Sequence, residues 1–537
     1  MNLARSVTDV LADHVSFEVE CIDRMYCNVY VPRLQFARGL VGLVHNHLGL
    51  PVASTAPLGR ITERFAKQVH AFARQHQIPW VDFAKGERKD DVMARQLAAF
   101  SAPEGVVFIG RAQEKTAMFR TEKRRHADGR SYPWIVKSTG VVNHFYVYCL
   151  DADFGPFFLK FGSYFPYNAK LCLNGHHWAQ RQADKAGIGF TAMDNAFAAV
   201  DDVAGLQAIC DSLGPTQIYA LLEKWLKLLP NPFTDADRDA GYRYQVSVLQ
   251  AEFSLTQMLD APVTGRIFFE HVIRNNLDIG RADHIGLIFA RHIRHGKQRP
   301  TPGRFRTRVV TTGVTPSLHA DYKHATIKQY HKEGRALRTE TTINDTRDFD
   351  IRKGLGNLPA LREIGFSANR RLLGVQRLDH DPIVGARDLH HLTDPVVTDT
   401  GSRIPGLPLG RPRSHALLSA LLTFRTQIAG FTNHDLRMLT AQLRGIPPAS
   451  LTAGQTTYDL RRLRSHGLIE RTPHSNRYRV TDHGLRTAML ITRIHDRLLP
   501  TALAHQTDTH PGHRLQTAAA AYQRALDKLA EQNALAA

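Results

Sequence analysis

Cysteine is scarce in this chain and is never paired at short spacing. The five cysteines include no C-x-x-C motif, which argues against a disulfide framework and against a zinc knuckle. No apolar run approaches the roughly 18–20 residues of a membrane span. The first residues, MNLARSVTDVLADHV, carry acids where a signal peptide needs an apolar core. We therefore expect a cytoplasmic protein with no membrane partner.

Nucleotide-binding and hydrolase motifs are also missing. The chain contains no GxxxxGK(S/T) loop, no GxGxxG fingerprint and no GxSxG elbow. Nothing in it therefore favours P-loop nucleotide hydrolysis, dinucleotide redox chemistry or a nucleophile-elbow hydrolase. The class of function has to come from charge and from individual residues.

Positive charge is what the sequence has in excess, and it is localised. The 537 residues carry a formal net charge of +19. Residues 291–380 hold 19 lysines and arginines against 8 aspartates and glutamates, and residues 401–537 hold 18 against 8. Residues 1–290 are close to neutral. Two basic blocks in the second half favour a polyanionic partner, and we expect nucleic acid, with DNA favoured over RNA.

The hydrophobic pattern predicts a multidomain α+β protein. Alternation predicts strands at 15–32, 78–83, 105–110, 132–165 and 303–345. Helical spacing predicts helices at 61–77 and 358–376 and through the region 174–296, including YQVSVLQAEFSLTQML at 244–259. A chain of 537 residues is too long for one ordinary core.

Composition and turn residues place the domain boundaries. The first half is expected to form a small α/β domain at 1–130 and an antiparallel sheet followed by a helical region at 131–296. A basic β-rich domain at 297–380 follows, with a hairpin at 317–344, and then a proline-rich linker at 381–412. The chain closes with a helical module ending in a hairpin at 413–500 and a final helix at 501–537.

The basic β-rich domain contains the stretch KQYHKEGRALRTETTIND at 328–345. Glu333 and Gly334 suit a two-residue hairpin turn, which would place Lys332 opposite Arg335 and Gln329 opposite Arg338. One face then carries hydrogen-bonding side chains, and a slip of one residue would exchange the two faces. The members of that face are Gln329, His331, Arg338, Glu340, Thr342 and Asn344.

This face offers the components of phosphodiester cleavage without a metal. Arg338 presents a planar fork for a phosphate, Glu340 can act as a base, and His331 can exchange protons near neutral pH. The candidate catalytic residues are His331, Arg338, Glu340, Lys328 and Tyr330. The candidate backbone contacts are Arg335, Lys332 and Asn344. There are two alternatives. The face binds the nucleic-acid backbone without cleaving it, or it is a solvated face with cross-strand ion pairs.

No set of residues forms a clear metal site. His45 and His47 lack a third ligand, and Asp82 precedes Glu87 too closely for the two to occupy neighbouring strands. The pair Asp151 and Asp153 fits ordinary turn chemistry. We expect no cofactor, with a divalent metal as the alternative.

The module at 413–500 has a specific order of elements. Three helical segments at 414–427, 430–445 and 451–467 precede a strand, a tight turn and a second strand within 468–484. The stretch YDLRRLRSHGLIERTPHSNRYRVTDHG at 458–484 resembles the winged helix-turn-helix family of MarR-type regulators. The resemblance covers about a sixth of the chain and implies that the third helix enters the major groove while the wing follows the backbone.

The resemblance also implies roles for individual residues. Leu460, Leu463 and Leu468 would be core. The residues expected to face DNA from the third helix are Thr452, Gln455, Thr456 and Arg462, and those on or near the wing are Arg471, His474, Asn476 and Arg477. MarR-type regulators are short dimers, whereas this module ends a long chain, so the role of regulator does not transfer with the fold. The whole chain resembles a group of uncharacterised bacterial proteins, which adds no catalytic residues.

Two functions follow from these patterns. The first is a nucleic-acid-processing enzyme, a nuclease by preference, in which the two basic blocks hold the strand and the 328–345 hairpin carries the chemistry. The second is a winged-helix transcriptional regulator or architectural protein without enzymatic activity. The sequence indicates no oligomeric state.

Overall fold

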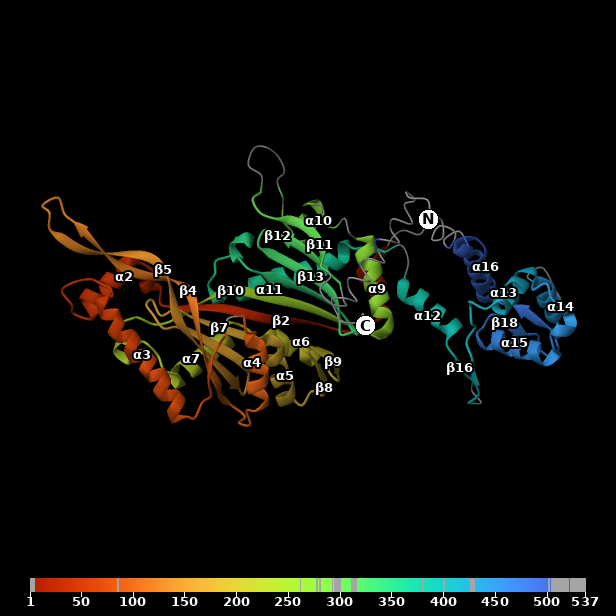
Figure 1. Cartoon of the computed structure of the whole chain (residues 1–537), viewed down its shortest axis with the longest axis horizontal. Helices are drawn as coiled ribbons and strands as arrows, with labels where there is room; N and C mark the ends of the chain where they lie inside the picture. The colour runs from red at the N-terminus through yellow and green to blue at the C-terminus, as the bar shows by residue number, and fades with distance from the viewer. Residues whose placement is uncertain are drawn as a thin grey trace. The chain divides into compact units, whose positions relative to one another are not determined.

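The chain folds into two compact units, Met1–Ile383 and Val384–Ala537 (Figure 1). We call them the sheet unit and the C-terminal unit. The computed structural model describes residues 5–500 except 85, 261, 277–278, 280–281, 292, 294–300, 311–315, 379–380, 399–400 and 425–429, and it also describes residues 503 and 521. The expected helix at 501–537 therefore lies outside the described residues, apart from these two positions.

One mixed sheet of eleven strands organises the sheet unit, in the order β11-β12-β13-β14-β10-β2-β7-β6-β5-β4-β3. Neighbouring strands are antiparallel except β3 and β4, which are parallel. The strands are β2 (Val15–Tyr30), β3 (Trp80–Asp82), β4 (Gly105–Arg125), β5 (Ser131–Asp151), β6 (Gly155–Gly162), β7 (Ala169–Asn174), β10 (Gln245–Leu259), β11 (Phe305–Val310), β12 (Ser317–Tyr322), β13 (Ala325–Lys332) and β14 (Ala336–Ile343).

This sheet joins the three domains that the sequence separates. Strands from the ranges 1–130, 131–296 and 297–380 are all members of it. The long central strands β2 and β10 pair with each other, and β10 also pairs with β14, so main-chain hydrogen bonds connect all three ranges. Turn residues mark where a strand ends but carry no information on which strand it pairs with, and this is why the expected boundaries within the sheet unit are wrong.

One face of the sheet is apolar and is covered by helices. These are α3 (Ala56–Gln75), α7 (Pro215–Leu228), α10 (Ala282–Ile288) and α11 (Leu358–Val375). Phe65 of α3, Trp225 of α7 and Phe366 of α11 share one buried core with Met25 and Phe253 of the sheet. Burial of these large side chains is the main favourable term for the unit, at about 25 cal/mol per Å² of apolar surface.

The opposite face, which we call the polar face, carries the alternate residues of the same strands. Helices α5 (Gly175–Ala186) and α6 (Val203–Ser212) and the hairpin of β8 (Phe190–Met193) and β9 (Ala196–Val200) cover one part of it, above Val19 and Cys21. Helix α4 (Lys89–Ala98) covers a second part through Val92, which packs with Phe108 and Tyr148. Elsewhere on β2, Arg24 is exposed and Asn28 is half-buried.

Strands β4 and β5 continue beyond the sheet as a two-stranded ribbon. They pair from Gly105 opposite Leu150 to Arg125 opposite Ser131, whereas β6 pairs only with residues 144–151 of β5. Figure 1 shows the ribbon extending from the sheet beside α2 (Ala37–Gly42) and α3. Phe119 and Ile135 anchor its base in a cluster with residues of α2 and α3.

The region 244–259 is a strand, not the predicted helix. Residues Gln245–Leu259 form β10, which pairs with β2 on one side and β14 on the other. Most positions of this central strand are buried on both faces, and Gln245, Gln250, Glu252 and Gln257 interrupt its apolar residues. A strand buried on both faces lacks the strict alternation of apolar and polar residues, so spacing alone does not distinguish it from a helix. The other four helices predicted in the region correspond to α6, α7, α9 (Pro262–Asn275) and α10.

The predicted linker at 381–412 contains regular structure. It includes α12 (Pro382–Thr393) and a small hairpin of β16 (Val396–Val397) and β17 (Arg403–Ile404). Leu392 and Leu407 are buried in the core of the C-terminal unit. Proline and glycine here shape turns between short elements and do not form an extended connection.

The C-terminal unit follows the predicted order of elements. Its core holds the buried side chains of Leu460, Leu463 and Leu468, as expected, and an isolated bridge pairs Phe431 with Tyr478. The elements are α13 (Pro412–Phe424), α14 (Asn433–Leu443), α15 (Ala453–Ser465), β18 (Ile469–Arg471), β19 (Tyr478–Val480) and α16 (Asp482–Arg493).

The remaining elements are short. They are β1 (Arg5–Ser6), which pairs with β15 (Arg377–Leu378), the helices α1 (Val7–Leu11) and α8 (Asp235–Asp239), and the single turns η1 (Pro32–Gln35), η2 (Leu43–His47), η4 (Thr346–Phe349), η5 (Leu355–Asn357), η6 (Pro448–Ser450) and η7 (Ile494–Leu498). Among the described residues, no helix combines the length and the hydropathy needed to cross a bilayer.

Candidate functional site

The β13–β14 hairpin forms where the sequence predicts it, but its register differs by one residue. Lys332 is opposite Ala336, Tyr330 is opposite Arg338 and Lys328 is opposite Glu340. The loop therefore holds three residues, and Glu333 and Gly334 both have positive φ angles, of 47° and 69°. The shift exchanges the faces of β13 relative to β14, so Lys328, Tyr330 and Lys332 join Arg338 and Glu340 on the polar face.

His331 lies on the apolar side of the hairpin, away from Arg338 and Glu340. Its ring is buried and lies close to Gly265 of α9. Burial, together with the nearby Arg266, lowers the pKa of His331 to about 4. The ring is therefore neutral near pH 7 and lies away from Arg338 and Glu340, so the structure does not support the proton-exchange role predicted for His331.

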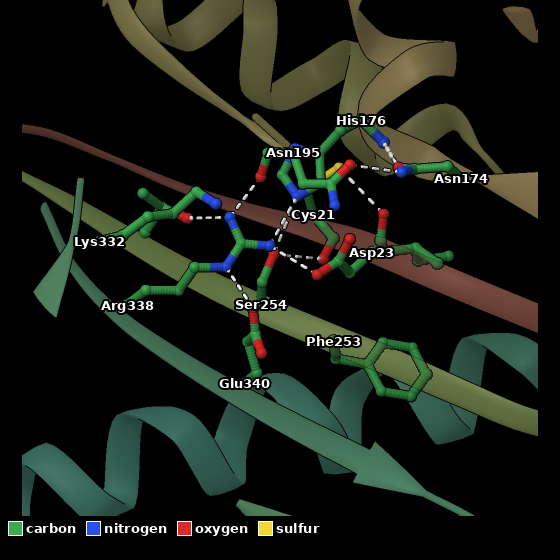
Figure 2. Close-up of polar contacts among 12 residues, drawn as sticks. Cys21, Asp23, Asn174, His176, Asn195, Phe253, Ser254, Lys332, Arg338 and Glu340 are labelled. Atoms are coloured by element: carbon green, nitrogen blue, oxygen red, sulfur yellow. Dashed lines mark hydrogen bonds and ion pairs between the residues drawn. The ribbon is translucent and has the colours of Figure 1, made fainter. Parts of the chain in front are cut away.

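Arg338 is fully buried at the centre of a hydrogen-bond network beneath α5 and the β8–β9 hairpin (Figure 2). Its Nε donates to Glu340 Oε1 (2.5 Å) and its Nη2 donates to Asp23 Oδ2 (2.6 Å). The remaining contacts are from Nη1 to Thr256 Oγ1 (3.1 Å) and to the carbonyl oxygen of Asn195, and between Nη2 and His176 Nε2 (3.2 Å). Four of the five N–H groups of the guanidinium thus have an oxygen acceptor, and the fifth points at the ring nitrogen of His176. None remains for a phosphate, so the predicted phosphate-binding role of Arg338 is not supported.

Glu340 is held by the same network. Its Oε1 accepts hydrogen bonds from Arg338 and from the hydroxyl of Tyr330 (2.9 Å). Burial, and then the charge of Glu340, raise the pKa of Tyr330 well above its usual range. Tyr330 is consequently a hydrogen-bond donor that fixes Glu340, and it does not ionise near neutral pH.

Of the other predicted residues of the hairpin, Lys328 and Lys332 lie on the polar face, whereas Arg335 and Asn344 are exposed at its ends. Lys328 Nζ lies 4.0 Å from the centre of the Tyr330 ring, and Lys332 is buried with its Nζ 3.7 Å from Asp194 Oδ2. Arg335 is exposed in the loop, and Asn344 is exposed with its Nδ2 donating to the carbonyl oxygen of His324 (2.8 Å). Of the five proposed catalytic side chains, Lys328, Tyr330, Arg338 and Glu340 therefore lie together on the polar face, and His331 lies on the apolar side.

Carboxylates gather beside this network. Asp23 on β2 and Glu340 on β14 flank β10, which carries the half-buried Glu252. Burial, together with the negative charges of Asp23 and Glu340, raises the pKa of Glu252 to about 7. Sequence reasoning missed Asp23 and Glu252 because the partners are more than 80 residues apart in the chain and β10 was predicted as a helix.

The raised pKa of Glu252 predicts a pH-dependent stability. A carboxyl whose pKa is higher in the folded state retains its proton while the unfolded state has lost it, so stability falls as pH rises from about 4 to about 7. Glu252→Gln should therefore match the wild type near pH 4 and exceed it at pH 8 by about 3 kcal/mol. All four tryptophans lie in the sheet unit, so urea denaturation followed by their fluorescence measures the free energy of unfolding of that unit.

Glu63→Gln, at an exposed position of α3, is the matched control. The same stability difference at pH 4 and pH 8 for Glu252→Gln would contradict the prediction.

Helix α15 presents a polar outer surface in the C-terminal unit. Thr452 caps it, and Gln455 completes a capping box in which each residue bonds to the main chain of the other. Thr456 is buried, and its hydroxyl donates to the carbonyl oxygen of Thr452 (3.2 Å). The prediction that Thr456 faces DNA is therefore wrong, since it shares the inner side of the helix with Leu460 and Leu463.

The outer surface of α15 contains residues that the sequence analysis did not select. Tyr458, Arg461 and Arg464 are exposed. Arg462 Nη2 donates to the hydroxyl of Tyr458 (3.1 Å), and its guanidinium lies 4.8 Å from the centre of the Tyr458 ring. The spacing of the buried leucines on this helix would have identified Tyr458 and Arg461 as outward-facing.

The β18–β19 hairpin has exposed cations and an internally bonded turn. Arg471 Nε donates to the carbonyl oxygen of Ser475 (2.9 Å), and Arg471 Nη2 donates to Asn476 Oδ1 (3.2 Å). Arg477 Nη1 donates to the carbonyl oxygen of Gly430 (3.0 Å). His474 lies in the turn with a positive φ of 55°. Arg471, Asn476 and Arg477 thus hold the hairpin in shape while their side chains remain exposed.

The residues weighed as metal ligands have protein partners. His47 Nε2 lies 2.6 Å from Asp237 Oδ1, and Asp82 forms an ion pair with Arg111. Asp151 is buried and accepts hydrogen bonds from Lys224 and Trp225. These contacts account for the three groups without a metal.

One group in the described part of the chain brings possible metal ligands together. It consists of His415 on α13 with His495 and Asp496 in η7. Asp496 Oδ1 lies 2.9 Å from His415 Nε2 and 3.1 Å from His495 Nδ1, and the two rings are stacked with centroids 3.8 Å apart. Imidazole nitrogen and carboxylate oxygen suit zinc, but stacked rings direct their lone pairs side by side, so the rings would have to turn to share one ion.

Comparison of the chain with known proteins finds no matching family model, no matching curated protein and no matching solved structure. Function has to be argued from the side chains described above. Two arrangements of described residues bear on function first: the outer surface of α15 with its adjoining hairpin, and the polar face of the sheet.

Proposed function

We propose that the chain is a DNA-binding protein and that its C-terminal unit binds duplex DNA as a winged helix. Helix α15 enters the major groove, and the β18–β19 hairpin follows the phosphate backbone as the wing. The order α13, α14, α15, β18, β19 and the bridge between Phe431 and Tyr478 support this proposal. The arginine-rich block at 401–537 supplies the electrostatic attraction.

The observation that carries the proposal is that cations on α15 face outward while the neighbouring acids are already engaged. Arg461 and Arg464 are exposed, and neither has an acidic partner within the described residues. Asp459 is buried and accepts two hydrogen bonds from Arg413 (2.7 and 3.0 Å), and Asp435 closes the cap of α14. The cations on this surface are therefore available for phosphates or base edges.

A second candidate function is phosphodiester cleavage on the polar face of the sheet. One observation favours it: the pKa of Glu252 is raised to about 7 by burial and by two neighbouring carboxylates. A carboxyl group that titrates near neutral pH is suited to general acid–base catalysis. The exposed Arg24, on β2 beside Asp23, could bind a phosphate. Glu252 then takes the proton-transfer role that the sequence analysis gave to His331.

DNA binding is tested by fluorescence anisotropy of the full-length protein with a labelled duplex of about 20 base pairs. We expect affinity to fall steeply between about 50 and 200 mM KCl, with a slope of about −0.9 for each phosphate contacted. Single-stranded DNA and double-stranded RNA of the same sequence should bind more weakly. No detectable binding to the duplex at about 50 mM KCl would contradict the proposal.

The same samples distinguish the two candidates. Incubation of the duplex and of its single strand with Mg²⁺ or with EDTA, followed by gel electrophoresis, reports cleavage. Product that is lost with Glu252→Gln assigns the enzymatic function to the polar face, and intact DNA in every lane removes that candidate while leaving the binding result unaffected.

A further inference from the structure

A polar cavity of about 450 Å³ lies in the sheet unit and is lined mainly by β2, β4, β5, β6 and β7. Its lining includes Lys115, Lys160 and Lys170, with Glu114 as the single acid. The other lining side chains are mostly neutral hydrogen-bonding groups, among them Asn28, Tyr30, Thr116, His144 and Ser247. A volume of this size accommodates a small-molecule ligand.

Two lysines occupy directly opposite positions in the wall of this cavity. Lys160 on β6 is paired with Lys170 on β7, and the next residue in the same row, opposite Lys170 on β2, is the neutral Asn28. Like charges directly opposite each other destabilise a sheet. Burial lowers the pKa of Lys160, Glu114 opposes that effect, and the charge of Lys170 adds to the lowering. The folded protein therefore tolerates an unfavourable charge pair at this point.

The one acid of the cavity does not neutralise the pair. Glu114 accepts hydrogen bonds from Lys160, from the hydroxyl of Tyr146 and from Lys89 Nζ (3.0 Å). Burial alone would raise the pKa of Glu114, but these three donors outweigh burial and hold it at about 2. Lys170 has no ion-pair partner among the residues that the structure describes. One negative charge thus faces several cations, and Lys170 is left without a counter-charge.

We infer that this cavity binds the phosphate group of a nucleotide-sized ligand, with Lys170 and Lys160 as the cationic contacts. A phosphate placed between the two lysines would remove their repulsion and supply the missing negative charge. The neutral groups around them offer hydrogen bonds to the rest of the ligand. Gln35 and Asn168 bond to each other in both directions, at 3.0 and 3.1 Å, and form a fixed polar part of the cavity lining.

His144 contributes hydrogen bonding and not charge to this cavity. Burial, and then the charge of Lys160, lower the pKa of His144. Its Nδ1 lies 3.2 Å from the carbonyl oxygen of Val142, which fits a neutral ring that donates from Nδ1 and accepts at Nε2. A hydroxyl or amine of the ligand is the matching group.

The test is isothermal titration calorimetry of the full-length protein with AMP, ATP, adenosine, inorganic phosphate and a 5′-phosphorylated tetranucleotide. We expect AMP or ATP to bind and adenosine to bind at least about tenfold more weakly, because adenosine lacks the charge. Equal affinity for the tetranucleotide and AMP identifies the source as a nucleic-acid end, and preference for AMP or ATP identifies a free nucleotide. No binding of any phosphorylated probe at about 1 mM would overturn the inference.

Lys170→Gln should lower the affinity for the preferred probe by about tenfold or more, and it should raise the melting temperature of the ligand-free protein by removing the repulsion. Asn28→Asp provides a second variant, since a carboxylate opposite Lys170 should also stabilise the protein and block the anion. Lys67→Gln, on the exposed side of α3, is the matched control. Unchanged affinity in Lys170→Gln would refute the assignment. DNA binding by the C-terminal unit is measured separately, so failure of either experiment leaves the other intact.

Discussion

Replacing Arg338 with methionine is expected to lower the free energy of unfolding of the sheet unit by about 3–5 kcal/mol, because removal of one partner leaves buried charges uncompensated. Asp23 and Glu340 would both lose their ion pair with the guanidinium. His176 and Thr256 would lose hydrogen bonds as well. Urea denaturation followed by tryptophan fluorescence measures the change.

The loss of unfolding free energy in Arg338→Met should also depend on pH. Burial raises the pKa of Asp23, and Arg338 opposes that effect. Without Arg338 the pKa of Asp23 rises further, so the folded variant binds a proton that the unfolded chain has released, and stability falls as pH rises above about 4. The variant should therefore be least stable relative to the wild type at pH 8.

Arg335→Met, in the exposed loop of the same hairpin, is the control and should change stability by less than about 0.5 kcal/mol. Adding Asp23→Asn and Glu340→Gln to Arg338→Met should recover part of the loss, since the two carboxylates that Arg338 neutralises are then uncharged. If Arg338→Met lowered the free energy of unfolding by less than about 1 kcal/mol, the ion pairs of Arg338 would not have the expected strength.

Replacing Arg461 and Arg464 together with alanine is expected to weaken DNA binding by about tenfold to several hundredfold, at about 1–3 kcal/mol for a base contact and less for a phosphate contact. Both arginines lie on the outer surface of α15 and have no acidic partner in the described structure. The salt dependence of the affinity should become shallower by about one unit for each phosphate that the variant no longer binds. Fluorescence anisotropy across a salt series measures both effects.

The variant Thr456→Val tests whether Thr456 is buried, as in the structure, or faces DNA, as the sequence analysis predicts. The hydroxyl of Thr456 is buried and bonded to the main chain of its own helix, so the variant should bind DNA within about twofold of the wild type. A large loss of DNA affinity in Thr456→Val, together with a small loss of affinity in the double arginine variant, would place the DNA on a different surface of the unit.

The order of elements in the C-terminal unit was accessible from the sequence because every signal there is local. Capping residues such as Thr432 and Thr452, the spacing of Leu460 and Leu463 and the polar turn between two short strands all lie within a few residues of the elements they define. The error at Thr456 was avoidable, since it lies four residues before Leu460 on the same side of the helix.

The candidate site on the sheet was not accessible in the same way. The positions of β13 and β14 could be predicted, but their register depends on whether the loop contains two or three residues, and Glu333 adopts a backbone conformation unusual for a residue with a side chain. The partners of Arg338 come from β2, β10, α5 and the β8–β9 turn. Such pairings are set by the topology of the whole sheet, which local periodicity does not encode.

The ribbon of β4 and β5 separates some of the protein's charge from its body. Beyond the anchored residues Phe119 and Ile135, the chain carries Lys123, Arg124, Arg125 and Arg130, all exposed. The outermost paired residues are Arg125, about 20 Å beyond Phe119, and Ser131, about 14 Å beyond Ile135, at about 3.4 Å per residue. The Debye length is about 10 Å at 0.1 M ionic strength. In a physiological buffer these cations therefore attract an anion almost independently of the charges on the sheet, and only in dilute salt do the two act together.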